Sequence, residues 1–279
     1  MSIKQQVEDA LFLAENGRHL GALTNLMLAV AASSRKTFPK DKTKSIKDPK
    51  KMMGDGEAFT LFLGGRIRKI LFGDFGGSDI GNSGISVNFK RKQLDVAYIL
   101  YKYYRCELVH EGELPEDIEF SPPDDDRNMG ISNGGVSVSI SSGNAMSLDY
   151  GWIGLLVNAV THARCNGKLF GIEHFDLVAV EGVNEKDHCD SIVKKYDITP
   201  GRYQILKEAT RHITPTSVVG DNDDVLIQKF SDLVKKNVIN GGSITGLSIH
   251  QLSDRSGKLL PKGVEIIREI GKAYQIVPA

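Results

Sequence analysis

The sequence has no excess of charge, no paired cysteines and no metal-ligand spacing. Its 35 basic and 35 acidic side chains give a formal net charge of zero, which excludes a protein that attracts nucleic acid over its whole surface. The cysteines are odd in number and lack Cys-x-x-Cys spacing, which disfavours a disulfide framework and a zinc ribbon; they are Cys106, Cys165 and Cys189. We therefore expect reduced thiols, no metal and no cofactor.

Long apolar segments are also missing. The most apolar stretch, residues 21–32, is 12 residues long, whereas a helix that spans a bilayer needs about 20. The first residues, MSIKQQVEDA, are mostly polar and do not show the apolar segment of a signal peptide. The sequence predicts a cytoplasmic protein without a membrane partner.

What is present indicates a mainly helical fold. Apolar residues recur at helical spacing around Trp152 and in the segments 3–34, 56–73 and 91–110. The pair Asn16-Gly17 interrupts the first of these, which predicts either two helices or one kinked helix. Residues 129–148 instead alternate apolar residues with serines, a pattern that predicts a β-hairpin.

We predict that residues 1–170 form a helical bundle with this hairpin inserted, and that residues 171–199 connect it to a small α/β domain at 200–279. Helices are expected there at 200–213, 225–238 and 264–274, with a shorter helical piece at 247–252. Residues 257–263, GKLLPKG, resemble the wing of winged-helix domains. That resemblance implies a module that binds nucleic acid or a partner protein.

Residues 35–53 form a basic segment with eight basic and two acidic side chains. Pro39 and Pro49 argue against a regular element here, so we predict a loop. It is either a solvated linker or a surface that contacts the phosphate backbone of nucleic acid. In the second case the RNA-binding residues are Arg35, Lys36, Lys40, Lys42, Lys44 and Lys47.

The strongest candidate for chemistry is the segment RCELVHEG, in which Arg105 precedes His110 by five positions. Arginine is always charged and binds phosphate at two points, and histidine moves protons near neutral pH. Together they can cleave RNA without a metal, because histidine accepts the 2′-hydroxyl proton while arginine stabilises the charged phosphorane. The alternative is a structural pair, in which Arg105 bonds Glu107 and His110 stabilises the end of a helix.

An arginine followed by four residues and a histidine, near the end of a helix in a helical domain, resembles the motif of the HEPN superfamily. This resemblance covers roughly residues 3–165. It implies a metal-independent endoribonuclease of the kind found in toxin–antitoxin and antiviral defence systems, with Arg105 and His110 as the catalytic pair. It also implies a homodimer in which two motifs meet, and an antitoxin or defence protein as a possible partner. Cys106 stands where such ribonucleases commonly carry a small polar residue.

The geometry of a straight helix places Arg105 and His110 about 140° apart, so a joint site needs the helix to end near His110 or needs a second subunit. Supporting roles are predicted for Glu111, which can orient His110, and for Glu15 and Arg18, together with His19, in the first helical region. The alternative function is a non-enzymatic, nucleic-acid-binding or regulatory dimer that acts through residues 200–279. A third possibility is nucleotide sensing by the glycine-rich loop at 73–86.

Overall fold

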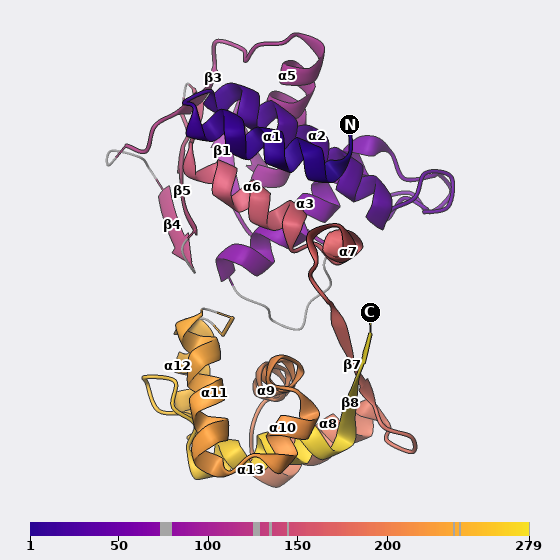
Figure 1. Cartoon of the computed structure of the whole chain (residues 1–279), viewed down its shortest axis with the longest axis vertical. Helices are drawn as coiled ribbons and strands as arrows, with labels where there is room; N and C mark the ends of the chain where they lie inside the picture. The colour runs from indigo at the N-terminus through magenta and orange to yellow at the C-terminus, as the bar shows by residue number, and fades with distance from the viewer. Residues whose placement is uncertain are drawn as a thin grey trace. The chain divides into compact units, whose positions relative to one another are not determined.

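The computed structural model describes residues 1–72, 80–124, 129–133, 136–143, 145–236, 238–239 and 241–278. The chain divides into two compact units, and residues 1–72 and 78–172 belong to the first. Residues 173–279 and 73–77 belong to the second. The structure is mainly helical with small sheets, as the hydrophobic periodicity predicts (Figure 1). Residues 73–79 of the glycine-rich loop lie outside the described residues.

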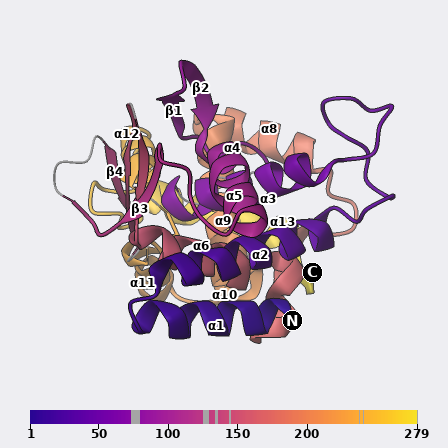
Figure 2. The same cartoon turned by 90° about the horizontal axis from the view of Figure 1, so that it is seen from above.

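The first unit begins with two helices, α1 (Ile3–Glu15) and α2 (His19–Thr37), which lie side by side (Figure 2). Of the two predictions for residues 3–34, two helices rather than one kinked helix is correct. The Ser2 hydroxyl accepts a hydrogen bond from the Gln5 N–H at 3.2 Å, and the Gln5 side chain accepts one from the Ser2 N–H. This capping box starts α1, and Gly17, at a φ of 71°, reverses the chain.

Helix α2 packs against α3 (Asp55–Phe72) and α6 (Gly151–Thr161). The core between these helices is apolar and contains Trp152, Phe59, Leu63, Leu23, Leu26 and Met27, each no more than 1% exposed. One face of a four-stranded sheet packs on α6 through β5 (Val136–Ser141). Its strand order is β3-β6-β5-β4, with β3 at Ile118–Ser121, β4 at Met129–Asn133 and β6 at Met146–Asp149.

The predicted hairpin at 129–148 is present as β4 and β5, which pair antiparallel. Strand β6 then pairs with β5 antiparallel and with β3 in parallel, so the hairpin belongs to a larger mixed sheet. The buried Asp149 carboxylate accepts bonds from the Ser139 hydroxyl and from the Gly151 N–H, at 2.5 and 2.9 Å. These bonds join the sheet to the start of α6.

Residues 86–95 depart from the expected pattern, because the helix predicted from residue 91 begins only at Val96. Before it, β1 (Ser86–Phe89) and β2 (Lys92–Asp95) form a two-stranded hairpin. Lys90 and Arg91 make the turn at φ values of 50° and 62°, positions that usually carry glycine or asparagine. Asp95 ends the hairpin and caps the helix, since its carboxylate accepts a bond from the Ala97 N–H at 2.8 Å.

Helix α9 (Pro200–Ile213) lies at the centre of the second unit. It contacts five other helices: α8 (Glu185–Tyr196), α10 (Pro215–Gly220), α11 (Asp223–Lys235), α12 (Gly241–Ile249) and α13 (Pro261–Ala273). Its two strands, β7 (Phe175–Ala179) and β8 (Tyr274–Pro278), pair antiparallel and bring the two ends of the unit together. Residues 171–199, interpreted above as a connector, therefore contain β7 and α8. Of the wing-like residues 257–263, residues 257–260 follow a turn closed by the isolated Ser253–Leu259 bridge, and residues 261–263 begin α13.

Candidate functional site

One continuous helical segment carries the Arg105–His110 motif. It consists of α4 (Val96–Ile99), the π-helical turn η1 (Leu100–Arg105) and α5 (Cys106–His110). Tyr104 and Leu108 bury the inner face of this segment. In the π-turn the Cys106 N–H donates to the carbonyl of Tyr101, five residues back. Wide turns of this kind occur frequently at functional sites, and this one ends at the arginine of the motif.

The structure brings Arg105 and His110 together within one chain. Arg105 Nη1 lies 3.4 Å from His110 Nε2, because the long arginine side chain extends along the helix to its last turn. Helix α5 ends at His110, and Gly112, at a φ of 80°, turns the chain away. The helix end that a joint site requires is therefore present, and the His110 side is exposed to solvent.

The two side chains combine complementary chemistry. A guanidinium can only donate hydrogen bonds, and the roles of the imidazole nitrogens in this contact depend on the tautomer. An imidazole beside a fixed cation provides the two groups that proton transfer and phosphate binding require.

Arg105 rests on the ring of Tyr101, with its guanidinium carbon 5.9 Å from the ring centre. Tyr101 is held in turn by Phe59, whose ring centre lies 5.3 Å away, and by Gly56. A Cβ atom on Gly56 would lie only 2.7 Å from the Tyr101 ring, so glycine is needed there. Arg105 Nε is buried and has no hydrogen-bond partner among the described residues.

A second arginine cluster lies close to this pair. The Arg35 Nε donates to the Asp55 carboxylate at 2.6 Å, and its other nitrogens donate to the carbonyls of Phe38 and Met53. The pKa of Asp55 lies below its usual value, mainly because its carboxylate accepts a hydrogen bond from Arg35. Burial raises this pKa, whereas the charges of Arg35, Lys40 and Arg105 lower it further. Asp55 therefore lies within electrostatic reach of both the basic loop and the motif.

Tyr101 is a member of the same cluster. Burial raises the pKa of its hydroxyl, with further contributions from the Cys106 thiol, while the charge of Arg105 opposes the rise. The Cys106 thiol therefore lies close enough to the Tyr101 hydroxyl to affect its pKa. Sequence reasoning missed Gly56, Asp55 and the position of Tyr101 beneath Arg105, because nothing in the sequence indicates that the start of α3 packs against the π-turn.

The basic loop is folded against α3. The Glu57 carboxylate accepts bonds from the N–H groups of Ile46 and Lys47, at 2.8 and 3.2 Å. Burial raises the pKa of Glu57, but these bonds and one from Ser45 outweigh it, so the net pKa is lowered. The Arg35 side chain is bonded to other groups of the protein, as described above. The five lysines that were predicted to bind RNA are exposed: Lys36, Lys40, Lys42, Lys44 and Lys47.

Two of the supporting residues lie at the far end of α2. Arg18 precedes the first residue of α2 and Arg35 lies near its last turn, a separation of roughly 25 Å at about 1.5 Å per residue. Glu15 and Arg18 are exposed, and the neighbouring His19 stacks on Tyr150 with ring centres 3.8 Å apart. Within one chain the structure does not bring these three residues to Arg105 and His110.

Glu111 follows His110 directly and is exposed. Its backbone N–H donates to the Glu107 carbonyl at 2.7 Å, and no hydrogen bond joins its carboxylate to His110 in the described part of the chain. Among the described residues, no group of three or more His, Cys, Asp or Glu side chains is arranged to hold a metal ion. No helix in those same residues is both long and apolar enough to cross a bilayer.

The fold and this site define a mainly helical protein with an exposed Arg–His pair at the end of a helix. The chain belongs to the Rv1289 family, whose model matches residues 2–206. The match spans the first unit and ends inside α9 of the second. Neither the curated proteins nor the solved structures include a significant match to this chain.

Proposed function

We propose that this protein is a metal-independent endoribonuclease of the HEPN type, in which Arg105 and His110 form the catalytic pair. The observation that carries the proposal is the 3.4 Å separation of Arg105 Nη1 and His110 Nε2 at an exposed helix end.

The reaction begins when His110 accepts the proton of an RNA 2′-hydroxyl. The 2′-oxygen attacks the adjacent phosphorus, and Arg105 stabilises the charge that develops on the phosphorane oxygens. The bond from phosphorus to the 5′-oxygen then breaks, which gives a 2′,3′-cyclic phosphate and a 5′-hydroxyl. The leaving oxygen needs a proton, and a homodimer supplies it from the second copy of the motif.

The lysines of the basic loop hold the RNA backbone beside this pair. Lys40 and Arg105 both lower the pKa of Asp55, so a lysine of the loop and the arginine of the motif lie within electrostatic reach of the same carboxylate. Lys40, Lys42, Lys44 and Lys47 form no ion pair with any other described residue, so their charges remain available to phosphates. We place the enzyme in the cytoplasm, in antiviral defence or toxin-like growth control, with an antitoxin or defence protein as its regulator.

The test is incubation of the full chain with labelled RNA in EDTA. Wild type should produce 2′,3′-cyclic phosphate ends, and Arg105→Ala and His110→Ala should each abolish them. Arg255→Ala and His162→Ala are matched controls, since both change exposed residues outside the motif. If wild type leaves diverse RNAs intact, the enzyme hypothesis loses to the alternative, a binding or regulatory protein that acts through its second unit.

A further inference from the structure

The first turn of α3 touches both the support of Arg105 and the basic loop. Gly56 lies against the Tyr101 ring, on which the Arg105 guanidinium rests. The next residue, Glu57, accepts hydrogen bonds from the backbone of the loop. Because the two residues are neighbours at one helix end, the loop and the catalytic arginine are positioned by the same element.

Arg35 closes the base of the basic loop. Its guanidinium donates to the carbonyls of Phe38 and Met53, at 3.3 and 3.2 Å. Phe38 is where the chain leaves α2, and Met53 is where it returns toward α3. Both side chains are buried, at 6% and 4% exposed. The two ends of the loop are therefore fixed to the first unit.

Backbone bonds hold the two sides of the loop together. The Met53 N–H donates to the Thr43 carbonyl at 2.9 Å, and the Ser45 N–H donates to the Lys51 carbonyl at 3.0 Å. An isolated antiparallel bridge lies between these two bonds. Residues 43–53 thus form a short, irregular hairpin.

Glu57 anchors the tip of this hairpin to α3. Its Oε1 accepts bonds from the N–H groups of Ile46 and Lys47, at 2.8 and 3.2 Å, and the Ser45 hydroxyl also bonds the carboxylate. In the part of the chain that the structure describes, no other hydrogen bond or ion pair joins residues 44–51 to a residue outside the loop. The position of the tip therefore depends on one side chain.

The tip presents positive charge to solvent. Lys44 and Lys47 are exposed and form no ion pair with another described residue, whereas Lys51 pairs with Asp48 inside the loop at 3.2 Å. Free lysines on a fixed backbone attract a chain of phosphates without reading its sequence. A backbone that is ordered before binding also lowers the entropy cost of the contact.

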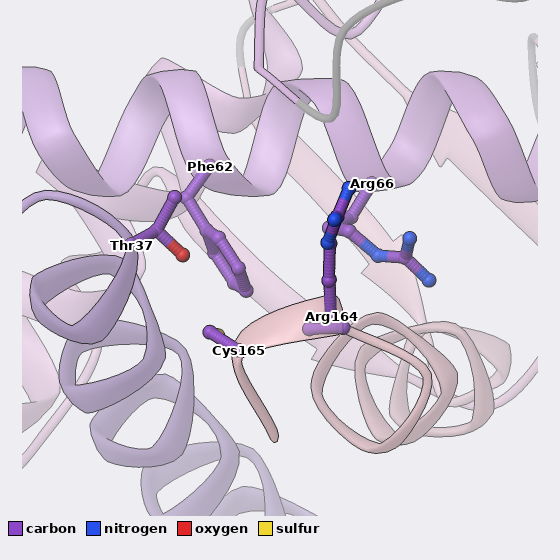
Figure 3. A pocket seen from close by; sticks show the side chains of 6 residues that line it. Thr37, Phe62, Arg66, Arg164 and Cys165 are labelled. Carbon is purple, nitrogen blue, oxygen red and sulfur yellow. The ribbon is translucent and has the colours of Figure 1, made fainter. Parts of the chain in front are cut away.

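The pocket of the first unit does not provide this surface. It has a volume of about 260 Å³ and lies between the end of α2, the middle of α3 and the short turn η2 (Arg164–Asn166) (Figure 3). Six residues line it: Thr37, Phe62, Arg66, Ala163, Arg164 and Cys165. None of them belongs to residues 38–53 or to the motif, so we expect a nucleic acid backbone on the exposed hairpin and not in this pocket.

We propose that Glu57 is a positioning residue for the substrate: it holds the tip of the basic loop beside the catalytic pair, so that an RNA of several nucleotides contacts both at once. The inference rests on the proposed function, because it concerns how the same site selects its substrate. It implies that the preferred substrate is an oligonucleotide rather than a dinucleotide, since a single phosphate cannot contact Arg105 and the tip together.

Charge and position predict opposite effects when Glu57 is replaced. Glu57→Ala removes a negative charge, which by electrostatics alone should strengthen RNA binding. If the carboxylate instead positions the tip, the same change should weaken binding. Glu57→Gln separates the two effects, because it removes the charge but keeps an Oε1 atom that can accept both N–H bonds.

The first measurement is binding of a fluorescein-labelled 2′-O-methyl decanucleotide of adenosine to the full chain by fluorescence anisotropy. This probe lacks the 2′-hydroxyl and cannot be cleaved. We expect Glu57→Ala to weaken binding by about tenfold, through the loss of two or three phosphate contacts, and Glu57→Gln to bind like wild type. Glu181→Ala, which removes an exposed carboxylate in the second unit, is the control for net charge and should not weaken binding.

The second measurement compares cleavage of the unmodified decanucleotide with cleavage of adenylyl-(3′→5′)-adenosine. Glu57→Ala should raise KM for the decanucleotide and leave kcat unchanged, and it should cleave the dinucleotide like wild type. Hydrogen exchange should show faster exchange of the Ile46 and Lys47 amides in Glu57→Ala, with the amides of α3 unaffected.

The outcomes separate this inference from the ribonuclease itself. Weaker binding by Glu57→Ala with no cleavage by wild type would support the inference and reject the ribonuclease. The inference is overturned if wild type does not bind the probe, or if Glu57→Ala binds it as tightly as wild type does. An equal loss of activity on both substrates would also overturn it, because Glu57 would then act on the catalytic pair and not through the loop.

Discussion

His110 in the first unit and His188 in the second differ in their exposure to solvent and in their hydrogen-bond partners. His110 is exposed at a helix end, and its one described side-chain contact is the long approach of Arg105. His188 is partly buried, and its Nδ1 lies 2.9 Å from the Tyr203 hydroxyl, which in turn lies 2.9 Å from the hydroxyl of Tyr274.

The surroundings of the two histidines assign them different tasks. Tyr203 and Tyr274 are at most 2% exposed, so their hydroxyls depend on each other and on His188 for hydrogen bonds. A group bonded in this way stabilises the fold and is poorly placed to act on a substrate. His110 is exposed at the end of a helix, where the proposed function requires an imidazole that an RNA strand can reach.

The largest expected effect is that of replacing His110, and it distinguishes the role of His110 from that of His188. His110→Ala should lower RNA cleavage by about 10²- to 10⁴-fold, the usual range for a general base. Its free energy of unfolding should change by less than about 0.5 kcal/mol, as for other exposed substitutions. Cleavage kinetics and urea unfolding on the same preparation measure both quantities. A stability loss as large as the activity loss would make His110 a structural residue like His188.

The support under Arg105 gives the next largest effect. Gly56→Ala places a Cβ atom 2.7 Å from the Tyr101 ring, so the ring must shift and Arg105 with it. We expect cleavage to fall about ten- to a hundredfold, because small displacements of catalytic groups are costly. Gly54→Ala is the matched control, since nothing lies within 4 Å of its added Cβ. Full activity in Gly56→Ala would show that Tyr101 does not position Arg105.

The sequence predicts the two partners of the motif but not the residues that support them. Arg105 and His110 are five residues apart, so local spacing identifies them. Gly56 and Tyr101 come from helices 45 positions apart in the sequence, and only the packing of α3 on the π-turn joins them. The regular-helix estimate of 140° considers only the directions in which the two side chains leave the helix, and it leaves out the length of the arginine side chain, which reaches His110 in the structure.

The sequence does not predict two elements of the fold, the hairpin β1–β2 and helix α8, and the residues of each explain why. The hairpin β1–β2 turns through Lys90 and Arg91, so the usual Asn-Gly signal is absent. Helix α8 is strongly polar and buries only Ile192 and Tyr196, which hides its periodicity. Its start was still readable, because Asn184 accepts bonds from the N–H groups of Lys186 and Asp187 as an N-cap does.

A smaller effect belongs to the buried network of the second unit. Tyr203→Phe removes the hydroxyl that bonds both His188 and Tyr274, and leaving such groups unpaired costs about 1–3 kcal/mol. Far-UV circular dichroism should show the loss of stability, while RNA cleavage at low temperature is unchanged. Tyr98→Phe is the control, because Tyr98 is 38% exposed. Trp152, the one tryptophan of the chain, reports unfolding of the first unit by its fluorescence.

The smallest effect is a pH dependence that His188 should produce. Burial lowers the pKa of His188, as does the charge of Lys207, and Glu269 only partly opposes them. The unfolded chain, with a histidine pKa of about 6.5, therefore binds more protons than the folded chain just below that pH. Stability must then rise with pH through this window and level off above about 6.5.

Glu269, the carboxylate whose charge acts on His188, does not interfere in the same window. Burial raises the pKa of Glu269, but hydrogen bonds from Lys195 and Tyr196 outweigh it, so its net pKa is lowered and it titrates at more acidic pH. Urea unfolding of wild type and His188→Gln between pH 5 and 7 measures the difference, and the variant should lose the decline in stability on the acid side. If both proteins decline equally, the proton is bound by groups other than His188, and this prediction is wrong.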